Sequence, residues 1–285
     1  MKRRLAVAQM DSGASEEKNL DRMRSMTKEA AEKGADLILF PEHAIYLGEA
    51  MAKHAETAEG VYVRELAAIA AENHIYLHCG SLSEKTAEGK PYNTSFFFDR
   101  EGKLTAAYRK IHLFEADIPG GASVREADGV RAGERPVLAD TDFAKVGFAI
   151  CYDLRFPELF HYMADEGAQL LFLPANFTAE TGAAHWECLL RARAIENTCY
   201  VMAAGQIGQK PDFHAYGHSM IIDPWGEILA EAGEEEGLIF ADFDSEKIKE
   251  TRRKMPSLKN ARKELFIVSQ SDTMKRSRQA FEEKR

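Results

Sequence analysis

The feature that most constrains the fold is a short pattern that occurs once in each half of the chain. Residues 97–104 (FFDREGKL) and 221–228 (IIDPWGEI) resemble each other, and each predicts a β-hairpin around an Asp- and Gly-containing turn. Each half also supplies two segments with helical periodicity. We therefore predict two similar half-units of the α/β class, packed sheet against sheet with helices outside, as a four-layer αββα sandwich.

Short apolar runs alternate with amphipathic segments along the chain, which predicts strands alternating with helices. A doubly wound sheet stays open as the alternative, because the same order of elements occurs in both architectures. The expected strands cover residues 5–10, 36–40, 75–80, 94–98, 104–108, 136–140, 145–150, 169–173, 199–205, 220–222, 227–230 and 238–243. The expected helices cover residues 16–33, 63–73, 157–166, 185–198 and 245–254.

The chain is expected to form one domain followed by a tail. No linker, low-complexity run or change of composition divides residues 1–255. The C-terminal tail, residues 256–285, is mostly charged but carries the apolar run 265–268 (LFIV). We expect such a tail to dock, either on the body of the protein or on a partner subunit.

The charge balance argues against two classes of partner. The chain has 37 Lys and Arg residues against 46 Asp and Glu residues, a formal net charge of −9 at pH 7. This balance disfavours nucleic acid and anionic membranes. The apolar run 5–10 is too short for a secretory signal, and no segment has the length of a transmembrane helix. The four cysteines form no CxxC pair, so we expect a soluble cytoplasmic protein.

Cys151 lies where an expected strand gives way to a helix. It follows the apolar run 145–150, and Pro157, a residue favoured at the first position of a helix, comes shortly after it. A cysteine at such an elbow lies at the edge of a sheet and near the positive end of a helix. We expect this environment to lower the pKa of the thiol and to make the sulfur nucleophilic.

Two further reactive side chains, Glu42 and Lys110, also come just past expected strands. Strand ends gather ligands and catalytic groups in α/β sheets, so we expect both to meet Cys151. Glu42 can take the thiol proton, and the Lys110 ammonium and the Tyr152 backbone N–H can stabilise the oxyanion of an acyl transfer. Glu126, in the loop after Lys110, is a second carboxylate that can fix the ammonium or position a water.

Three signatures in this order resemble the nitrilase, or carbon–nitrogen hydrolase, superfamily. They are Pro41–Glu42, residues 108–114 (YRKIHLF) and residues 150–158 (ICYDLRFPE). The resemblance extends over nearly the whole chain, from Leu5 to about Pro256. It implies an αββα sandwich, a covalent thioester intermediate, no metal or other cofactor, and a homodimer or larger homo-oligomer.

The same resemblance assigns a role to each reactive residue. It implies that Glu42 is the general base, Lys110 the oxyanion stabiliser and Cys151 the nucleophile. Glu126 matches the second glutamate of the family.

Other segments resemble one branch of this superfamily, the omega-amidases and deaminated-glutathione amidases. These segments are residues 184–187 (AHWE), 190–196 (LRARAIE) and 216–220 (YGHSM). The resemblance implies hydrolysis of the ω-amide of a small keto or dicarboxylic acid, such as 2-oxoglutaramate or deaminated glutathione, with release of ammonia. A nitrilase or an N-carbamoyl amidohydrolase stays open, although Tyr152–Asp153 disfavours the first and Leu154 the second.

Arg155 is the candidate for binding the substrate carboxylate, by resemblance to omega-amidases. A guanidinium can hold a carboxylate with two parallel hydrogen bonds, which orients a small acid amide. The residues expected to line the pocket with it are Tyr152, Phe177, Thr181 and Tyr46. The alternative is that Arg155 only pairs with the neighbouring Asp153 or Glu158.

Three other classes of function stay open. In the first, a histidine activates Cys151, and the candidates are His112, His161 and His185. In the second, His214 and His218, which have ligand-like spacing, belong to a metal-binding module. In the third, the chain is an inactive scaffold or binding protein on the same fold.

Overall fold

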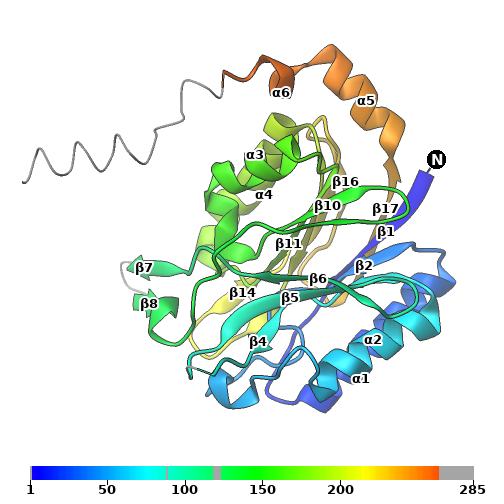
Figure 1. Ribbon diagram of the computed structural model, residues 1–285. Helices are drawn as coiled ribbons and strands as arrows, with labels where there is room; N and C mark the ends of the chain where they lie inside the picture. The colour runs from blue at the N-terminus through cyan, green and yellow to red at the C-terminus, as the bar shows by residue number, and fades with distance from the viewer. Residues whose placement is uncertain (1, 88, 118–122, 263–285) are drawn as a thin grey trace, which may run out of the picture.

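The protein is described by a computed structural model that covers residues 2–87, 89–117 and 123–262. Two β-sheets pack face to face, and a pair of helices covers the outer side of each sheet (Figure 1). This arrangement confirms the predicted αββα sandwich. The doubly wound single sheet is therefore wrong.

The first sheet has seven strands and carries the N-terminal helices. In spatial order its strands are β17 (Gly237–Asp244), β1 (Lys2–Gln9), β2 (Leu37–Leu39), β3 (Tyr76–His78), β5 (Tyr92–Phe98) and β4 (Leu82–Glu84), with β6 (Leu104–Arg109) paired to β5. Its helices are α1 (Glu16–Glu32) and α2 (Val61–Asn73). Strands β1, β2 and β3 are parallel, so their carboxyl ends meet at one edge.

Strand β1 shows why this sheet lies in the interior of the protein. Leu5 and Val7 point into the core between the sheets, whereas Ala6 and Ala8 point into the core under α1 and α2. Side chains alternate between the two faces of a strand, so a continuous apolar run such as LAVA buries both faces. The small alanines on the outer face let the helices approach closely.

The second sheet has six strands and carries the later helices. In spatial order its strands are β16 (Ile228–Glu231), β15 (Met220–Ile222), β12 (Tyr200–Gly205), β11 (Leu170–Ala175), β10 (Lys145–Phe148) and β9 (Leu138–Asp140). Its helices are α3 (Pro157–Asp165) and α4 (Ala179–Asn197). Strands β10, β11 and β12 are parallel, so this sheet also gathers three carboxyl ends at one edge.

Some elements differ from the sequence prediction. Helix α4 begins at Ala179, earlier than the expected start at residue 185, because the Thr178 hydroxyl caps it by accepting the Thr181 N–H. Short pairs of strands were not predicted: β7 (Glu115–Asp117) with β8 (Ser123–Arg125), and β13 (Ile207–Gln209) with β14 (His214–Tyr216). These pairs are three residues long, which is too short to show a period in the sequence.

The last helices of the described residues are α5 (Ser245–Lys254) and α6 (Ser257–Asn260). The apolar run at 265–268 lies outside the described residues, so the predicted docking of the tail stays a prediction. Of the helices in the described ranges, none has the length and apolarity needed to cross a bilayer.

Candidate active site

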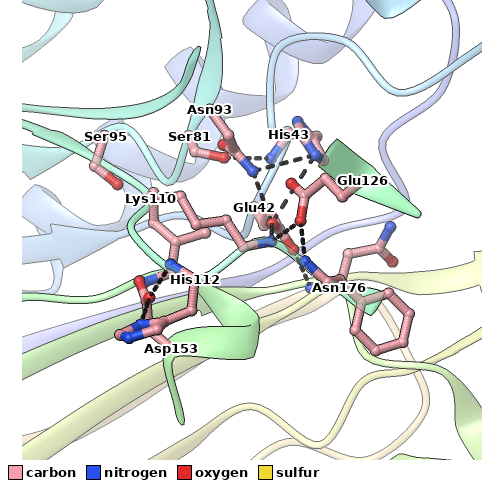
Figure 2. Close-up of polar contacts among 12 residues, drawn as sticks. Glu42, His43, Ser81, Asn93, Ser95, Lys110, His112, Glu126, Asp153 and Asn176 are labelled. Carbon is pink, nitrogen blue, oxygen red and sulfur yellow. Dashed lines mark hydrogen bonds and ion pairs between the residues drawn. The ribbon is translucent and has the colours of Figure 1, made fainter. Parts of the chain in front are cut away.

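Polar groups from both sheets converge on one cavity of about 310 Å³. Glu42 follows β2 and Lys110 follows β6 in the first sheet, whereas Cys151 follows β10 in the second. All three side chains line this cavity, as does Glu126 from the short 3-10 helix Glu126–Asp128. Figure 2 shows how Glu42, Lys110 and Glu126 point toward one another. The predicted convergence of strand ends is what brings these groups together.

The Glu42 carboxylate is almost completely buried and accepts hydrogen bonds on both oxygens. Its Oε1 accepts from Lys110 Nζ at 3.0 Å and from Asn93 Nδ2 at 2.9 Å, and its Oε2 accepts from the Asn176 N–H at 2.9 Å. Burial alone would raise the pKa of Glu42, but the Lys110 ammonium, together with the contact from the Cys151 thiol, outweighs it and holds the pKa below the ordinary value of 4.5. Glu42 is therefore an ionised carboxylate at neutral pH.

Lys110 lies between two carboxylates and is itself buried. Its Nζ is 3.0 Å from Glu42 Oε1 and 2.8 Å from Glu126 Oε2. Burial lowers the pKa of a lysine, but the two carboxylates outweigh this effect and raise the pKa of Lys110 well above 10.5. A permanent ammonium is thereby held beside Cys151. Glu126 contacts this ammonium and also accepts the Phe114 N–H at 2.6 Å, an arrangement compatible with the first of its two predicted roles.

Cys151 occupies a tight backbone elbow. Its φ is +47°, in the left-handed region, and it begins a 3-10 turn over Cys151–Arg155 instead of a long helix. The Asn176 N–H donates to Glu42 Oε2 at 2.9 Å and also interacts with the Cys151 thiol. Holding a non-glycine residue at positive φ costs about 1–3 kcal/mol, a strain typical of functional sites.

The expected low pKa of the Cys151 thiol is wrong. Burial and the facing Glu42 carboxylate raise the pKa well above 9.0, and the Lys110 ammonium and the Asn176 N–H offset only part of this rise. A 3-10 turn of five residues has too few aligned peptides to match the macrodipole of an α-helix. Cys151 is therefore a neutral thiol next to an ionised carboxylate, an arrangement that requires base-assisted attack.

Asp153 holds the elbow in place from the buried side. Its Oδ2 accepts the Ile150 N–H at 2.8 Å and the Tyr108 hydroxyl at 2.7 Å, and its Oδ1 accepts the His112 N–H at 3.0 Å. Because Tyr108 belongs to β6 and Asp153 follows β10, this bond also ties the two sheets together. Asp153 is thus a structural acceptor and forms no ion pair with Arg155.

The three histidines proposed as activators of Cys151 are engaged elsewhere, and none of them lines the cavity. The His112 ring stacks on Phe156 and places Nδ1 2.7 Å from Asp153 Oδ1. His161 contacts Asn197, and His185 contacts Arg155. The structure therefore contradicts the Cys–His arrangement.

The substrate-binding candidates lie mostly where they were expected. Tyr152, Arg155, Phe177 and Thr181 all line the cavity that contains Cys151. Tyr46 does not line it. Its hydroxyl donates to the Glu49 carbonyl and its ring stacks on His54, beside a separate and smaller cavity.

The Arg155 guanidinium contacts His185 Nδ1 at 3.3 Å and lies over the rings of Tyr152 and Phe177. Across the described ranges of the chain, no carboxylate lies within ion-pair distance of it, so the proposed pairing with Asp153 or Glu158 is wrong. Among the residues that the structure describes, the Arg155 guanidinium is thus a cation without a carboxylate partner in the wall of the reactive cavity.

Three polar groups of this site were missed in the sequence. Asn93 is buried within β5, Asn176 follows β11, and His43 follows Glu42 directly. Asn176 was detectable, because it comes just past an apolar run as Cys151 does. His43 has a left-handed φ of +57°, lies 3.9 Å from Glu42 Oε1, and has a pKa lowered by burial. It is therefore neutral at pH 7.

The metal-binding interpretation finds no support. Within the ranges that the structure describes, no group of three or more His, Cys, Asp or Glu side chains could hold a metal ion. His218 contacts Glu231 at 3.1 Å and stacks on Tyr216, so it does not form a ligand set with His214.

The chain matches the family model for carbon–nitrogen hydrolases over residues 4–253. This match spans most of the sequence and includes Glu42, Lys110, Glu126 and Cys151. The protein therefore belongs to the carbon–nitrogen hydrolase family, a class of enzymes, as the three signatures predicted.

Two curated relatives and one solved structure are similar over nearly their whole length. The omega-amidase NIT2 of Mus musculus is 40% identical over 93% of this chain and 97% of that protein. The deaminated glutathione amidase of a Synechocystis strain is 41% identical over 91% of this chain and 98% of that protein. The crystal structure of Saccharomyces cerevisiae Nit3, a nitrilase-superfamily member, superposes with a TM-score of 0.82 at 32% identity, covering 95% and 96% of the two chains.

Proposed function

We propose that this protein is a cysteine-dependent amidase that hydrolyses the ω-amide of a small keto or dicarboxylic acid and releases ammonia. The family membership and the two amidase relatives support the reaction class. The observation that carries the substrate class is the Arg155 guanidinium, which has no carboxylate partner among the described residues and lines the same cavity as Cys151. A substrate carboxylate bound there would place an amide a few bonds away against the sulfur.

The proposed cycle begins with proton transfer to Glu42. Its Oε1 already accepts two hydrogen bonds whereas Oε2 accepts one, so Oε2 takes the proton from Cys151 as the sulfur attacks the amide carbon. The oxyanion is stabilised by the Lys110 ammonium and the Tyr152 N–H. Glu42 passes the proton to the amide nitrogen, the C–N bond breaks, and ammonia leaves a thioester.

Deacylation uses the same groups with water as the nucleophile. Glu42 takes a proton from water as the oxygen attacks the thioester carbon, and the proton then returns to the departing sulfur. Glu126 keeps Lys110 in position throughout, at 2.8 Å. The cycle regenerates a neutral thiol, an ionised Glu42 and a free carboxylic acid.

The test is ammonia release from a panel of amides, nitriles and N-carbamoyl compounds, with and without a carboxylate. Wild-type protein should turn over carboxylate-bearing ω-amides, and Cys151→Ala should be inactive but folded. Arg155→Met should lower kcat/KM for these substrates roughly 10- to 100-fold, the value of a hydrogen-bonded charge pair, and leave neutral amides unaffected. Arg191→Met, which removes an exposed partner of Glu187 on α4, is the matched control. Equal losses on charged and neutral amides would contradict the role of Arg155.

A homodimer or larger assembly and a cytoplasmic location stay part of the proposal. Two large apolar side chains on the outer helices, Tyr162 of α3 and Ile195 of α4, are about half exposed, which supports association. Sedimentation velocity of the full chain tests the assembly, and a monomer at micromolar concentration would contradict it.

A further inference from the structure

A buried polar cluster lies directly behind the general base. Its centre is Gln206, which follows β12 and has no exposed surface. The Gln206 Nε2 group donates to the Glu42 carbonyl at 2.8 Å and to Ser12 Oγ at 2.9 Å, and Oε1 accepts the Ser12 N–H at 2.9 Å. Because Glu42 follows β2 of the first sheet and Gln206 follows β12 of the second, the bond to the Glu42 carbonyl connects segments from the two sheets.

Lys210 completes this cluster. Its buried Nζ donates to Asp11 Oδ1 at 2.7 Å and to the Ser12 carbonyl at 3.1 Å, and it lies 3.5 Å from Gln206 Oε1. The Lys210 N–H also donates to the Phe213 carbonyl at 2.8 Å, and Phe213 lines the reactive cavity. The Lys210 ammonium therefore connects the segment after β1 with the amide of Gln206, and the Lys210 backbone N–H bonds to a residue of the cavity wall.

The proposed cycle gives Gln206 and Lys210 no chemical step, but it requires Glu42 to be held in position, and Gln206, which Lys210 contacts, bonds to the Glu42 carbonyl. Glu42 must reach Cys151, which follows β10 in the same sheet as Gln206. A displacement of 1 Å at a reacting centre can reduce a rate about 100-fold. We propose that Gln206, oriented by Lys210, is a positioning residue that sets the Glu42 carboxylate against the Cys151 sulfur. This inference rests on the proposed function, because it assigns Gln206 to the general base of that cycle.

The sharpest variant is Gln206→Glu. The introduced carboxylate has the same shape, pairs with Lys210 and still accepts the Ser12 N–H, but it cannot donate to the Glu42 carbonyl. Gln206→Leu removes all of these bonds and serves as a second variant if the first fails to fold.

Gln9→Leu is the matched control. Gln9 ends β1 and is equally buried, and its side chain also makes four hydrogen bonds, to the Gly233 and Glu235 carbonyls and from the Ser219 N–H and hydroxyl. None of these partners lines the cavity.

Two readouts separate positioning from stability and from the proposed function itself. The first is the rate at which iodoacetamide alkylates Cys151 between pH 6 and 10, followed by peptide mass spectrometry with the exposed Cys188 as internal reference. The second is kcat and KM for amide hydrolysis. Urea denaturation of each variant confirms that the protein is folded.

We expect Gln206→Glu to lower kcat and the Cys151 alkylation rate at pH 7 roughly 10- to 100-fold, with KM within about twofold of wild type. Gln9→Leu should keep both rates even where it loses stability. Wild-type rates in Gln206→Glu, or equal losses in both variants, would overturn the inference. Inactivity of wild-type protein on every amide, together with slower alkylation in Gln206→Glu, would refute the proposed function and leave the positioning role standing.

Discussion

Replacing Lys110 by methionine separates what the buried ammonium does for the fold from what it does for the reaction. The Lys110 side chain is 2% exposed, and its two carboxylate partners, Glu42 and Glu126, are 4% and 13% exposed. Methionine has a similar length but no charge, so both carboxylates lose a partner within 3.0 Å. Glu42 keeps its bonds from Asn93 and Asn176, whereas Glu126 keeps one from Phe114.

Breaking a buried ion pair while leaving its partner charged costs about 3–5 kcal/mol. We expect the free energy of unfolding of Lys110→Met to fall by about that amount. Adding Glu126→Gln removes one of the two stranded charges and should restore roughly 1–3 kcal/mol, the penalty of a buried group without its partner. The exposed pair Lys249–Glu246 supplies the control, because Lys249→Met should cost less than about 1 kcal/mol.

Activity should not follow stability across this series. Loss of one oxyanion donor lowers kcat roughly 100- to 1000-fold, and Glu126→Gln restores no donor. Urea denaturation and ammonia release, measured on wild-type protein, the two single variants and the double variant, give a complete double-mutant cycle. If Lys110→Met is as stable as wild type, or if the double variant regains kcat with stability, the charge assignment of this site is wrong.

Three further outcomes follow from the geometry. Tyr108→Phe removes the 2.7 Å bond to buried Asp153 and should lower the free energy of unfolding by about 1.5–3 kcal/mol in urea denaturation; an unchanged stability would mean that Asp153 finds another donor. Gly80→Ala would place a Cβ 1.9 Å from the Pro41 carbonyl at a φ of +74°, so it should reduce both stability and ammonia release, whereas Gly34→Ala, at φ +78° in open space, should cost only about 1–2 kcal/mol of strain. The profile of kcat/KM should be flat between about pH 5 and pH 9, because the pKa of Glu42 is lowered below 4.5 and the pKa values of Cys151 and Lys110 are raised above 9.0 and 10.5; an acid limb with a midpoint near 6.5 would indicate a histidine base.

The main reactive residues of this site could be predicted from the sequence, because each of them follows an expected strand. Glu42 and Cys151 each follow an apolar strand of a parallel set, β1–β3 and β10–β12, whereas Lys110 follows β6, which pairs antiparallel with β5. The four layers were predicted from a different signal, the two similar hairpins and the two helical segments in each half of the chain.

Other parts of the site could not be predicted, because they depend on distances between segments that are remote in sequence. Asn93 lies inside a strand, and only its contact with Glu42 reveals its role. The direction in which the pKa of Cys151 is shifted depends on burial and on the facing Glu42 carboxylate. A local sequence pattern contains neither of these. Tyr46 follows Glu42 closely in sequence, yet the left-handed turn at His43 redirects the chain and takes Tyr46 to another cavity.

The division of the reactive groups between two sheets has a consequence for the newly synthesised chain. The acid–base pair belongs to the layer built mainly from the first 110 residues, and the sulfur belongs to the layer that follows it. When only the first layer has left the ribosome, Glu42 and Lys110 have no sulfur to act with, and Cys151 has no general base before the two layers dock. The complete set of reactive groups therefore exists only once the two sheets have packed together.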